Sequence, residues 1–256
     1  MWKNIRIFLL LVVLAAVALH TWLDRVATQS WHEPLWVGIF PLNADGSAPT
    51  EEYVSTLGVK DFAAIEDFFA REGRRYGLKL EQPVHVELYP LGSKLPPSLD
   101  PSAGPLGIAW WSLKLRYFAA RATTVPGRAP PRIRLFLLYH DPVPLERAPD
   151  SHGLQKGLVG VVHLFADPDM AGSNSIVIAH ELLHTVGASD KYDLRNGRPL
   201  FPSGYGDRDQ EPLYPQERAE IMAGRRALSS YQSDMPHTLA GVLIGPETAR
   251  EIRWTH

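Results

Sequence analysis

The sequence predicts an α+β fold, in which a mixed β-sheet is backed by helices and followed by an irregular C-terminal region. Apolar runs and helical patterns come in the order strand, helix, strand, helix, strand, strand, helix. Two of these strands follow each other without a long helix between them. Beyond Asp193 the chain is rich in glycine, proline and charge, up to a last helical stretch.

The individual elements follow from the spacing of apolar residues. A short apolar run, or an alternation of apolar and polar residues, is typical of a strand and occurs in residues 35–40, 84–88, 133–137 and 158–165. Apolar residues fall on one side of a helix in residues 62–76, and Gly77 follows where that helix can end. Further helices are expected in residues 108–122, around His180, and in residues 246–254.

Composition narrows the class of protein. A content of 45% hydrophobic and 21% charged residues is that of a folded globular chain. The formal net charge of −2 provides no basic field for nucleic acid, so no nucleic-acid partner is expected. The 256 residues include no cysteine, which excludes disulfides, thiolate nucleophiles and cysteine-based zinc sites.

The N-terminal residues have the pattern of a membrane anchor. Lys3 and Arg6 precede residues 7–23, which carry no formal charge, and a helix needs about 17–25 apolar residues to span a bilayer. We therefore expect a single-pass membrane protein whose remaining chain is exported, because flanking basic residues stay in the cytoplasm. The alternative is a cleavable signal peptide and a secreted protein, because residues 16–18 (Ala-Val-Ala) have the small-x-small shape of a cleavage site.

The strongest chemical signal is the pair His180 and His184. Residues four apart in a helix lie about 6 Å apart along its axis and about 40° apart around it, so the two imidazoles project side by side. Two such nitrogens can bind one metal ion at about 2.1 Å. Glu181 lies about 100° around the helix from His180, beside the ion, where it can accept a proton from a water molecule.

A third metal ligand is expected from the chain that follows the helix. Gly187 allows a sharp exit through the left-handed conformation, and this turn would bring Asp190 back to the metal as an oxygen ligand. Glu220, on a later segment, is the alternative third ligand. Three protein ligands and an open position for water are typical of a catalytic zinc, whereas a structural zinc is closed by four ligands.

The string His180-Glu181-x-x-His184-x-x-Gly187-x-x-Asp190 resembles the elongated zinc motif of metzincin peptidases, in the variant with aspartate in place of a third histidine. Snapalysin-like peptidases carry that aspartate. The continuation of the string through the next three residues is similar to the immune inhibitor A-type metallopeptidases.

A second point of resemblance lies around Met222. The segment from Ala219 to Gly224 is similar to the methionine turn that metzincins place beneath the metal. The tyrosine that many metzincins place two residues after this methionine is missing, because position 224 is glycine. The candidates for a phenol near the transition state are instead Tyr192, Tyr205 and Tyr231.

The resemblance implies a zincin-like fold and a zinc-dependent peptidase activity. The metallopeptidase domain would occupy residues 35–256, after the anchor and a short connector in residues 1–34. In the resembling enzymes, the strand equivalent to residues 158–165 forms the upper rim of the cleft, so an extended peptide or protein substrate could add to its free edge.

The site residues follow the same resemblance. Zn²⁺ would be bound by His180, His184 and Asp190, and Glu181 would act as the general base. The alternative is a zincin-fold domain of the cell envelope that binds a partner without cleaving it. Glu181 favours the enzyme, because a domain that only binds has no chemical need of that carboxylate.

Overall fold

The computed structural model describes residues 5–8, 11–12, 28–90, 94–100, 102–122, 129–143, 149, 151–154 and 158–255. Its centre is a five-stranded sheet with the strand order β2-β1-β3-β5-β4. Four of its strands are parallel: β1 (Leu35–Asn43), β2 (Val84–Leu88), β3 (Ile133–His140) and β5 (Val159–Phe165). The short β4 (His152–Leu154) is antiparallel to β5, so the sheet is mixed, as predicted.

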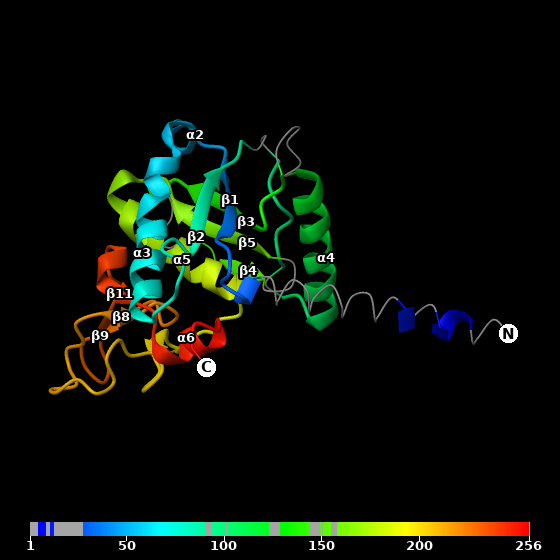
Figure 1. Ribbon diagram of the computed structural model, residues 1–256. Helices are drawn as coiled ribbons and strands as arrows, with labels where there is room; N and C mark the ends of the chain where they lie inside the picture. The colour runs from blue at the N-terminus through cyan, green and yellow to red at the C-terminus, as the bar shows by residue number, and fades with distance from the viewer. Residues whose placement is uncertain are drawn as a thin grey trace.

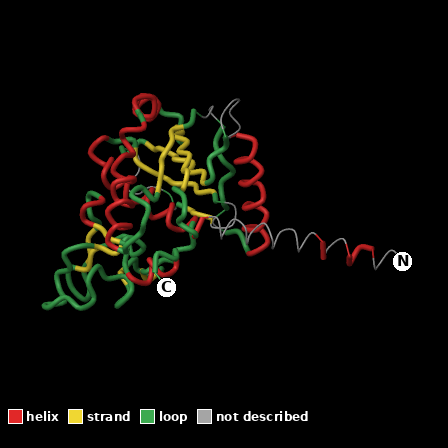
Figure 2. The backbone as a smooth tube through the Cα atoms, viewed as in Figure 1, coloured by secondary structure: helices red, strands yellow, loops and turns green. Residues whose placement is uncertain are grey.

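Helices cover both faces of this sheet (Figures 1 and 2). The strands of a parallel sheet are apolar on both sides when both sides are covered, and in β3 every residue except Arg134 is buried. On one face, α3 (Ala63–Arg75) and α5 (Ala171–Thr185) contribute to a large core cluster with the inward side chains of four strands. On the other face, α4 (Pro105–Ala122) packs through Trp111, Leu115 and Ala119.

The remaining elements are short. A helix α2 (Ala48–Thr56) and the 3-10 helix η1 (Val59–Phe62) connect β1 to α3, and η2 (Pro168–Met170) leads into α5. The irregular C-terminal region consists of two-stranded pieces, η3 (Leu239–Gly241) and the final helix α6 (Pro246–Glu251). Its paired strands are β6 (Tyr192–Asp193) with β7 (Arg198–Pro199), β8 (Ala219–Glu220) with β11 (Val242–Leu243), and β9 (Arg226–Ala227) with β10 (Ser233–Asp234).

The expectation that the strand in residues 158–165 has a free edge was wrong. This strand, β5, lies inside the sheet between β3 and β4, and β4 pairs with it from Val159 to Val161. The outer position at this side of the sheet belongs to β4. A strand of three residues is too short to produce a periodic pattern, so β4 was not predicted.

The segment before β1 is also not a free connector. Thr28 and Gln29 are 2% and 3% exposed, and Trp31 is 9% exposed. The indole Nε1 of Trp31 donates to the carbonyl oxygen of Ile252 at 2.7 Å, and its ring meets that of Trp254 edge to face. We call residues 28–31 the N-terminal strap, and the strap belongs to the folded domain.

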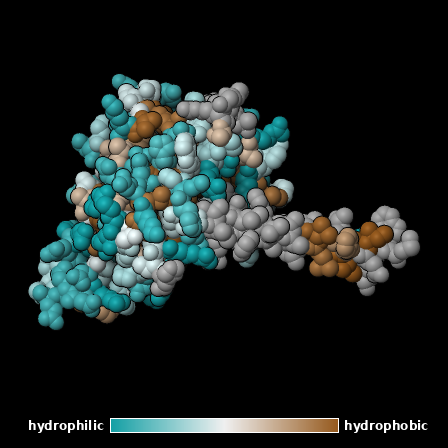
Figure 3. Space-filling model, viewed as in Figure 1, coloured by the Kyte–Doolittle hydropathy of each residue, from teal (hydrophilic) through white to brown (hydrophobic). Residues whose placement is uncertain are grey.

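The prediction of a single-pass membrane protein is corrected as well. A spanning helix needs about 20 predominantly apolar residues, and no helix in the described part of the chain is long and apolar enough to cross a bilayer. The longest described helix, α4, has 18 residues but carries Lys114, Arg116 and Arg121. Most of residues 7–23, including the alternative cleavage site, lies outside the described residues. The described apolar residues close to the N-terminus are exposed, namely Ile5, Ile7, Phe8, Leu11 and Val12. Figure 3 shows apolar atoms gathered near the tip of the segment that extends from the rest of the molecule.

Candidate metal centre

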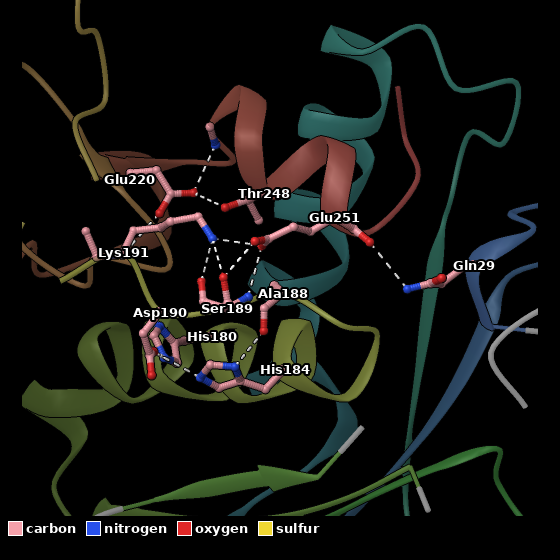
Figure 4. A network of polar contacts seen from close by, with 12 residues as sticks. Gln29, His180, His184, Ala188, Ser189, Asp190, Lys191, Glu220, Thr248 and Glu251 are labelled. Atoms are coloured by element: carbon pink, nitrogen blue, oxygen red, sulfur yellow. Dashed lines mark hydrogen bonds and ion pairs between the residues drawn. The ribbon is translucent and has the colours of Figure 1, made fainter. Parts of the chain in front are cut away.

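Helix α5 carries the two histidines on the side turned away from the sheet. Ile178, Ala179 and Leu182 are buried in the large core cluster, which fixes the rotation of the helix. The start of α5 is tied to the end of β5 by Asn174, whose amide donates to the Phe165 carbonyl at 2.8 Å and accepts from the Phe165 amide at 3.3 Å. With one face of α5 buried in this way, His180 and His184 point toward the C-terminal region (Figure 4).

Both imidazole rings are oriented by main-chain carbonyl groups. Nδ1 of His180 lies 2.9 Å from the Ile221 oxygen, and Nδ1 of His184 lies 2.9 Å from the Ala188 oxygen. A carbonyl oxygen can only accept a hydrogen bond, so Nδ1 of each ring must carry the hydrogen. In the neutral ring Nε2 then carries a free lone pair, and this is the form of histidine that binds a metal. A hydrogen-bond partner on the other ring nitrogen is typical of metal-binding histidines.

The chain leaves α5 through a turn that requires glycine. Gly187 has φ +105°, outside the range that side-chain-bearing residues readily adopt. The amide of Gly187 donates to the His184 carbonyl at 3.1 Å, and the amide of Ala188 donates to the Leu183 carbonyl at 3.0 Å. This pair of bonds is a Schellman motif, and it confirms the predicted helix end at Gly187.

The turn brings Asp190 to the two histidines, as the sequence predicted. Its Oδ1 lies 3.2 Å from Nε2 of His180 and 3.1 Å from Nε2 of His184. Two ligands about 2.0–2.1 Å from a tetrahedral zinc lie about 3.3–3.4 Å apart, so these spacings fit one shared ion. Oδ1 is buried, and no described donor makes a hydrogen bond to it. Three lone pairs therefore converge where a positive charge is needed, and the residues fit a metal ion.

The charges of these groups influence one another. Burial by itself lowers the pKa of His180, but Asp190, the charge of Glu181 and the Ile221 carbonyl together raise it above its ordinary value. Burial by itself raises the pKa of Asp190, but the two histidines hold it well below its ordinary range. Asp190 is therefore a carboxylate at neutral pH, the form that binds cations.

Glu181 lies beside this group. One possible ligand atom from each of His180, Glu181 and His184 lies within 4.8 Å of the other two. Glu181 is 6% exposed, so its carboxylate is held close to the site and largely out of bulk water. Asp190 rather than Glu181 has the contact distances of a third ligand, because its oxygen touches both Nε2 atoms.

Met222 lies in a tight turn next to His180. The amides of Ala223 and Gly224 donate to the Glu220 carbonyl at 3.0 and 3.1 Å, and Gly224 has φ +67°. Met222 is fully buried, and its carbonyl accepts the amide of Lys191 at 2.9 Å. Since the Ile221 carbonyl holds His180, the turn supports both a histidine and the segment that carries Asp190.

Glu220, the alternative third ligand, is occupied elsewhere. It is fully buried, its Oε1 accepts from the Gly245 amide at 3.0 Å and the Thr248 hydroxyl at 2.7 Å, and its Oε2 accepts from the Ala223 amide at 3.0 Å. Both oxygens thus join the methionine turn to the start of α6 (Figure 4). This geometry argues against Glu220 as a ligand.

The candidate tyrosines lie in different surroundings. The hydroxyl of Tyr205 is 2.8 Å from that of Tyr214, and burial together with this bond raises the pKa of Tyr205 to about 12. Tyr231 is 65% exposed. Tyr192 is half-buried in β6, directly after the segment that carries Asp190. These contacts do not assign the role of a phenol in catalysis to one of the three.

The sequence did not predict the groups that orient His180, His184 and the segment of Asp190. Two of them are main-chain carbonyls, of Ile221 and Ala188, which carry no side-chain signal. Another is Glu251, which binds the segment around Asp190 from α6. Comparison with known proteins adds no information about this site. No model of a known protein family matches this chain, and no curated protein is significantly similar to it.

Proposed function

We propose that this protein is a zinc-dependent peptidase with a zincin-like fold, of the metzincin type in which aspartate is the third ligand. One observation carries the proposal. Oδ1 of Asp190 lies 3.2 Å from Nε2 of His180 and 3.1 Å from Nε2 of His184, while Nδ1 of each imidazole donates its hydrogen to a main-chain carbonyl. Two imidazole nitrogens and one carboxylate oxygen are a set of ligands that suits Zn²⁺.

The number of ligands favours catalysis over a structural role. His180, His184 and Asp190 leave a fourth position open, whereas structural zinc sites are closed by four protein ligands. When bound there, zinc would polarise the scissile carbonyl and supply a water molecule with a pKa of about 7. The site would therefore hydrolyse peptide bonds at neutral pH.

Glu181 is the general base in this proposal. Its position next to His180 in the chain places the carboxylate beside the two imidazoles but on a different side of α5. There it would accept the proton of the attacking water and deliver it to the leaving amine. Because Glu181 is only 6% exposed, its carboxylate has little contact with bulk water, and the proton that it accepts would be retained in the site.

The substrate would be an extended peptide or protein segment. The outer strand of the sheet beyond β5 is β4, so main-chain groups on that side can receive an additional strand. Binding through the main chain tolerates many side chains, and we therefore expect a range of cleavable sequences.

A peptide-library digest tests this function. The purified full chain should cleave peptides, lose that activity on treatment with a chelator, and regain it when zinc is added back. Protein that holds about one zinc per chain but cleaves no peptide would support a domain that binds a partner instead. Protein that takes up no zinc after refolding in its presence would overturn the proposal.

A further inference from the structure

The segment that carries Asp190 is fixed on both sides by one residue of α6. The carboxylate of Glu251 accepts the Ser189 amide at 2.9 Å and the Ser189 hydroxyl at 2.6 Å. It also accepts a hydrogen bond from the ammonium group of Lys191 at 2.8 Å. Ser189 and Lys191 are the residues immediately before and after Asp190, so Glu251 binds the backbone and hydroxyl before the proposed ligand and the side chain after it (Figure 4).

The buried side chain of Lys191 adds hydrogen bonds of its own to this segment. It is 5% exposed, and its Nζ also donates to the Ser189 carbonyl and hydroxyl at 2.7 and 2.8 Å. A buried ammonium group is costly unless its hydrogens are bonded, and here a carboxylate and two oxygens satisfy it. We call Ser189, Lys191 and Glu251 the Asp190 clamp.

The N-terminal strap extends the clamp. The side-chain amide of Gln29 donates to the carbonyl of Val186 at 2.5 Å, at the end of the histidine helix. The same nitrogen lies 3.4 Å from the Glu251 carbonyl oxygen. Trp31 adds its bond to the Ile252 carbonyl and its edge-to-face contact with Trp254. The strap therefore contacts both the helix that carries the histidines and the helix that carries Glu251.

We infer that Glu251 and Gln29 are positioning residues for the metal site, so that its zinc affinity depends on docking of the strap. This inference rests on the proposed function, in which Asp190 is a zinc ligand. The side chain of Asp190 is 33% exposed and follows the turn at Gly187, so burial in the core does not fix its place opposite the histidines. The clamp supplies the missing restraint, and the strap holds the clamp against α5.

The expected change in zinc affinity follows from the usual effect of such positioning residues. Partners that orient metal ligands without touching the ion typically change metal affinity by about 10–100-fold when they are replaced. We expect Gln29→Glu, Ser189→Ala and Glu251→Gln each to fall in that range. Gln29→Glu keeps the size of the side chain but replaces the donor by an acceptor that faces two carbonyl oxygens.

A matched control comes from Gln216. It is buried to the same degree as Gln29, at 1% against 3% exposed, and its amide also donates to two main-chain carbonyls, those of Asp207 and Leu213. Gln216→Glu should therefore have a similar cost in thermal stability. It should leave zinc affinity within about twofold of the wild type, because Gln216 has no bond to the clamp.

The experiment is a zinc competition titration of the full chain against a chromogenic chelator, at a temperature where melting curves show every variant folded. The inference predicts weaker zinc binding for the three clamp and strap variants and unchanged binding for Gln216→Glu. The double variant that combines Gln29→Glu with Glu251→Gln should bind zinc more tightly than the product of the two single effects predicts. The reason is that both residues position Asp190 through the same group of contacts.

Three outcomes would count against the inference. Equal zinc affinity in the wild type and Gln29→Glu would overturn the role of the strap, and equal affinity in Glu251→Gln would overturn the clamp. Equal loss in Gln29→Glu and Gln216→Glu would show that affinity follows stability alone. If Gln29→Glu does not fold, Gln29→Leu tests the strap, since it removes the same donor without adding a charge, and unchanged zinc affinity in that variant would overturn the role of the strap. A wild-type chain without zinc would instead overturn the proposed function.

Discussion

Oδ1 of Asp190 lies 3.1 Å from Nε2 of His184, although neither atom carries a hydrogen when the ring is neutral. Two lone pairs at this distance repel each other unless a proton or a cation lies between them. His180 repeats the relationship at 3.2 Å. The carbonyls of Ile221 and Ala188 therefore do more than hold the rings, because they direct both lone pairs toward one carboxylate oxygen.

The first prediction separates the two candidates for the third ligand. Asp190→Ala should weaken zinc binding by more than the roughly 10–100-fold typical of losing an outer partner, because it removes a ligand. Glu220→Gln should retain about one zinc per chain and lose about 1–3 kcal/mol of stability, because an amide cannot accept all three of its hydrogen bonds. Zinc titration and thermal melting measure both. Loss of zinc in the Glu220 variant alone would contradict this assignment.

The second prediction concerns the turn at Gly187. Gly187→Ala should destabilise the fold by about 1–2 kcal/mol, because alanine resists a positive φ. It should also weaken zinc binding, since the turn sets the path to Asp190. Gly46→Ala is the control, because Gly46 has φ +71° with open space around it in the turn between β1 and α2. An equal drop in zinc affinity for both variants would show that strain alone, and not the path of the turn, controls the site.

The third prediction concerns Met222, which is fully buried and follows Ile221, the residue whose carbonyl accepts from His180. Met222→Leu conserves volume and should cost less than about 1.5 kcal/mol while leaving zinc binding intact. Met222→Ala leaves a cavity and should cost about 2–5 kcal/mol. Because the Ile221 carbonyl that holds His180 lies in the same turn, we also expect weaker zinc binding in the alanine variant. Intact zinc affinity in a strongly destabilised Met222→Ala protein would uncouple the turn from the metal site.

The fourth prediction is a pH dependence of stability that arises from Glu251. Burial by itself raises the pKa of Glu251, but bonds from Lys191 and Ser189 outweigh it and lower the pKa below its ordinary value of 4.5. A carboxylate with a lowered pKa in the folded state stabilises the protein above its ordinary pKa, and this contribution is lost as the pH falls through the lowered value. The difference in melting temperature between the wild type and Glu251→Gln, both kept metal-free, should therefore be largest near pH 7 and shrink below pH 4.5. A difference that is constant with pH would contradict the ionised clamp.

The sequence predicts that His180, His184 and Asp190 come together, because these residues lie close to one another in the chain. A helix of fixed pitch places His180 and His184 on one side, and Gly187 determines where the helix ends. The strands were also predictable, since a covered parallel sheet has apolar residues on both faces. The helix α2 was missed because only Thr50 of its residues is buried, which leaves no apolar stripe to detect.

The support around the ligands was not predictable, because it depends on contacts between distant parts of the chain. Gln29 is polar and lies in a stretch without apolar periodicity, yet it meets Val186 and Glu251 once the domain folds. Glu220 and Glu251 look alike as carboxylates in a sequence. Only the fold shows that Glu220 joins α6 to the methionine turn while Glu251 holds the segment of Asp190. The place of β4 at the outer side of the sheet had no signal either, because the strand has three residues.

The role of Glu181 as general base is tested by the rate of peptide hydrolysis in Glu181→Gln, compared with the wild type at equal zinc content. Glutamine keeps the size of the side chain and removes the base, while His180, His184 and Asp190 are untouched. We expect about one zinc per chain, wild-type thermal stability and a rate reduced by about 10²–10⁴-fold. Glu52→Gln, on the exposed side of α2, should cleave at the wild-type rate. A zinc-loaded Glu181→Gln protein that cleaves peptides as fast as the wild type would contradict the assignment of Glu181 as the general base.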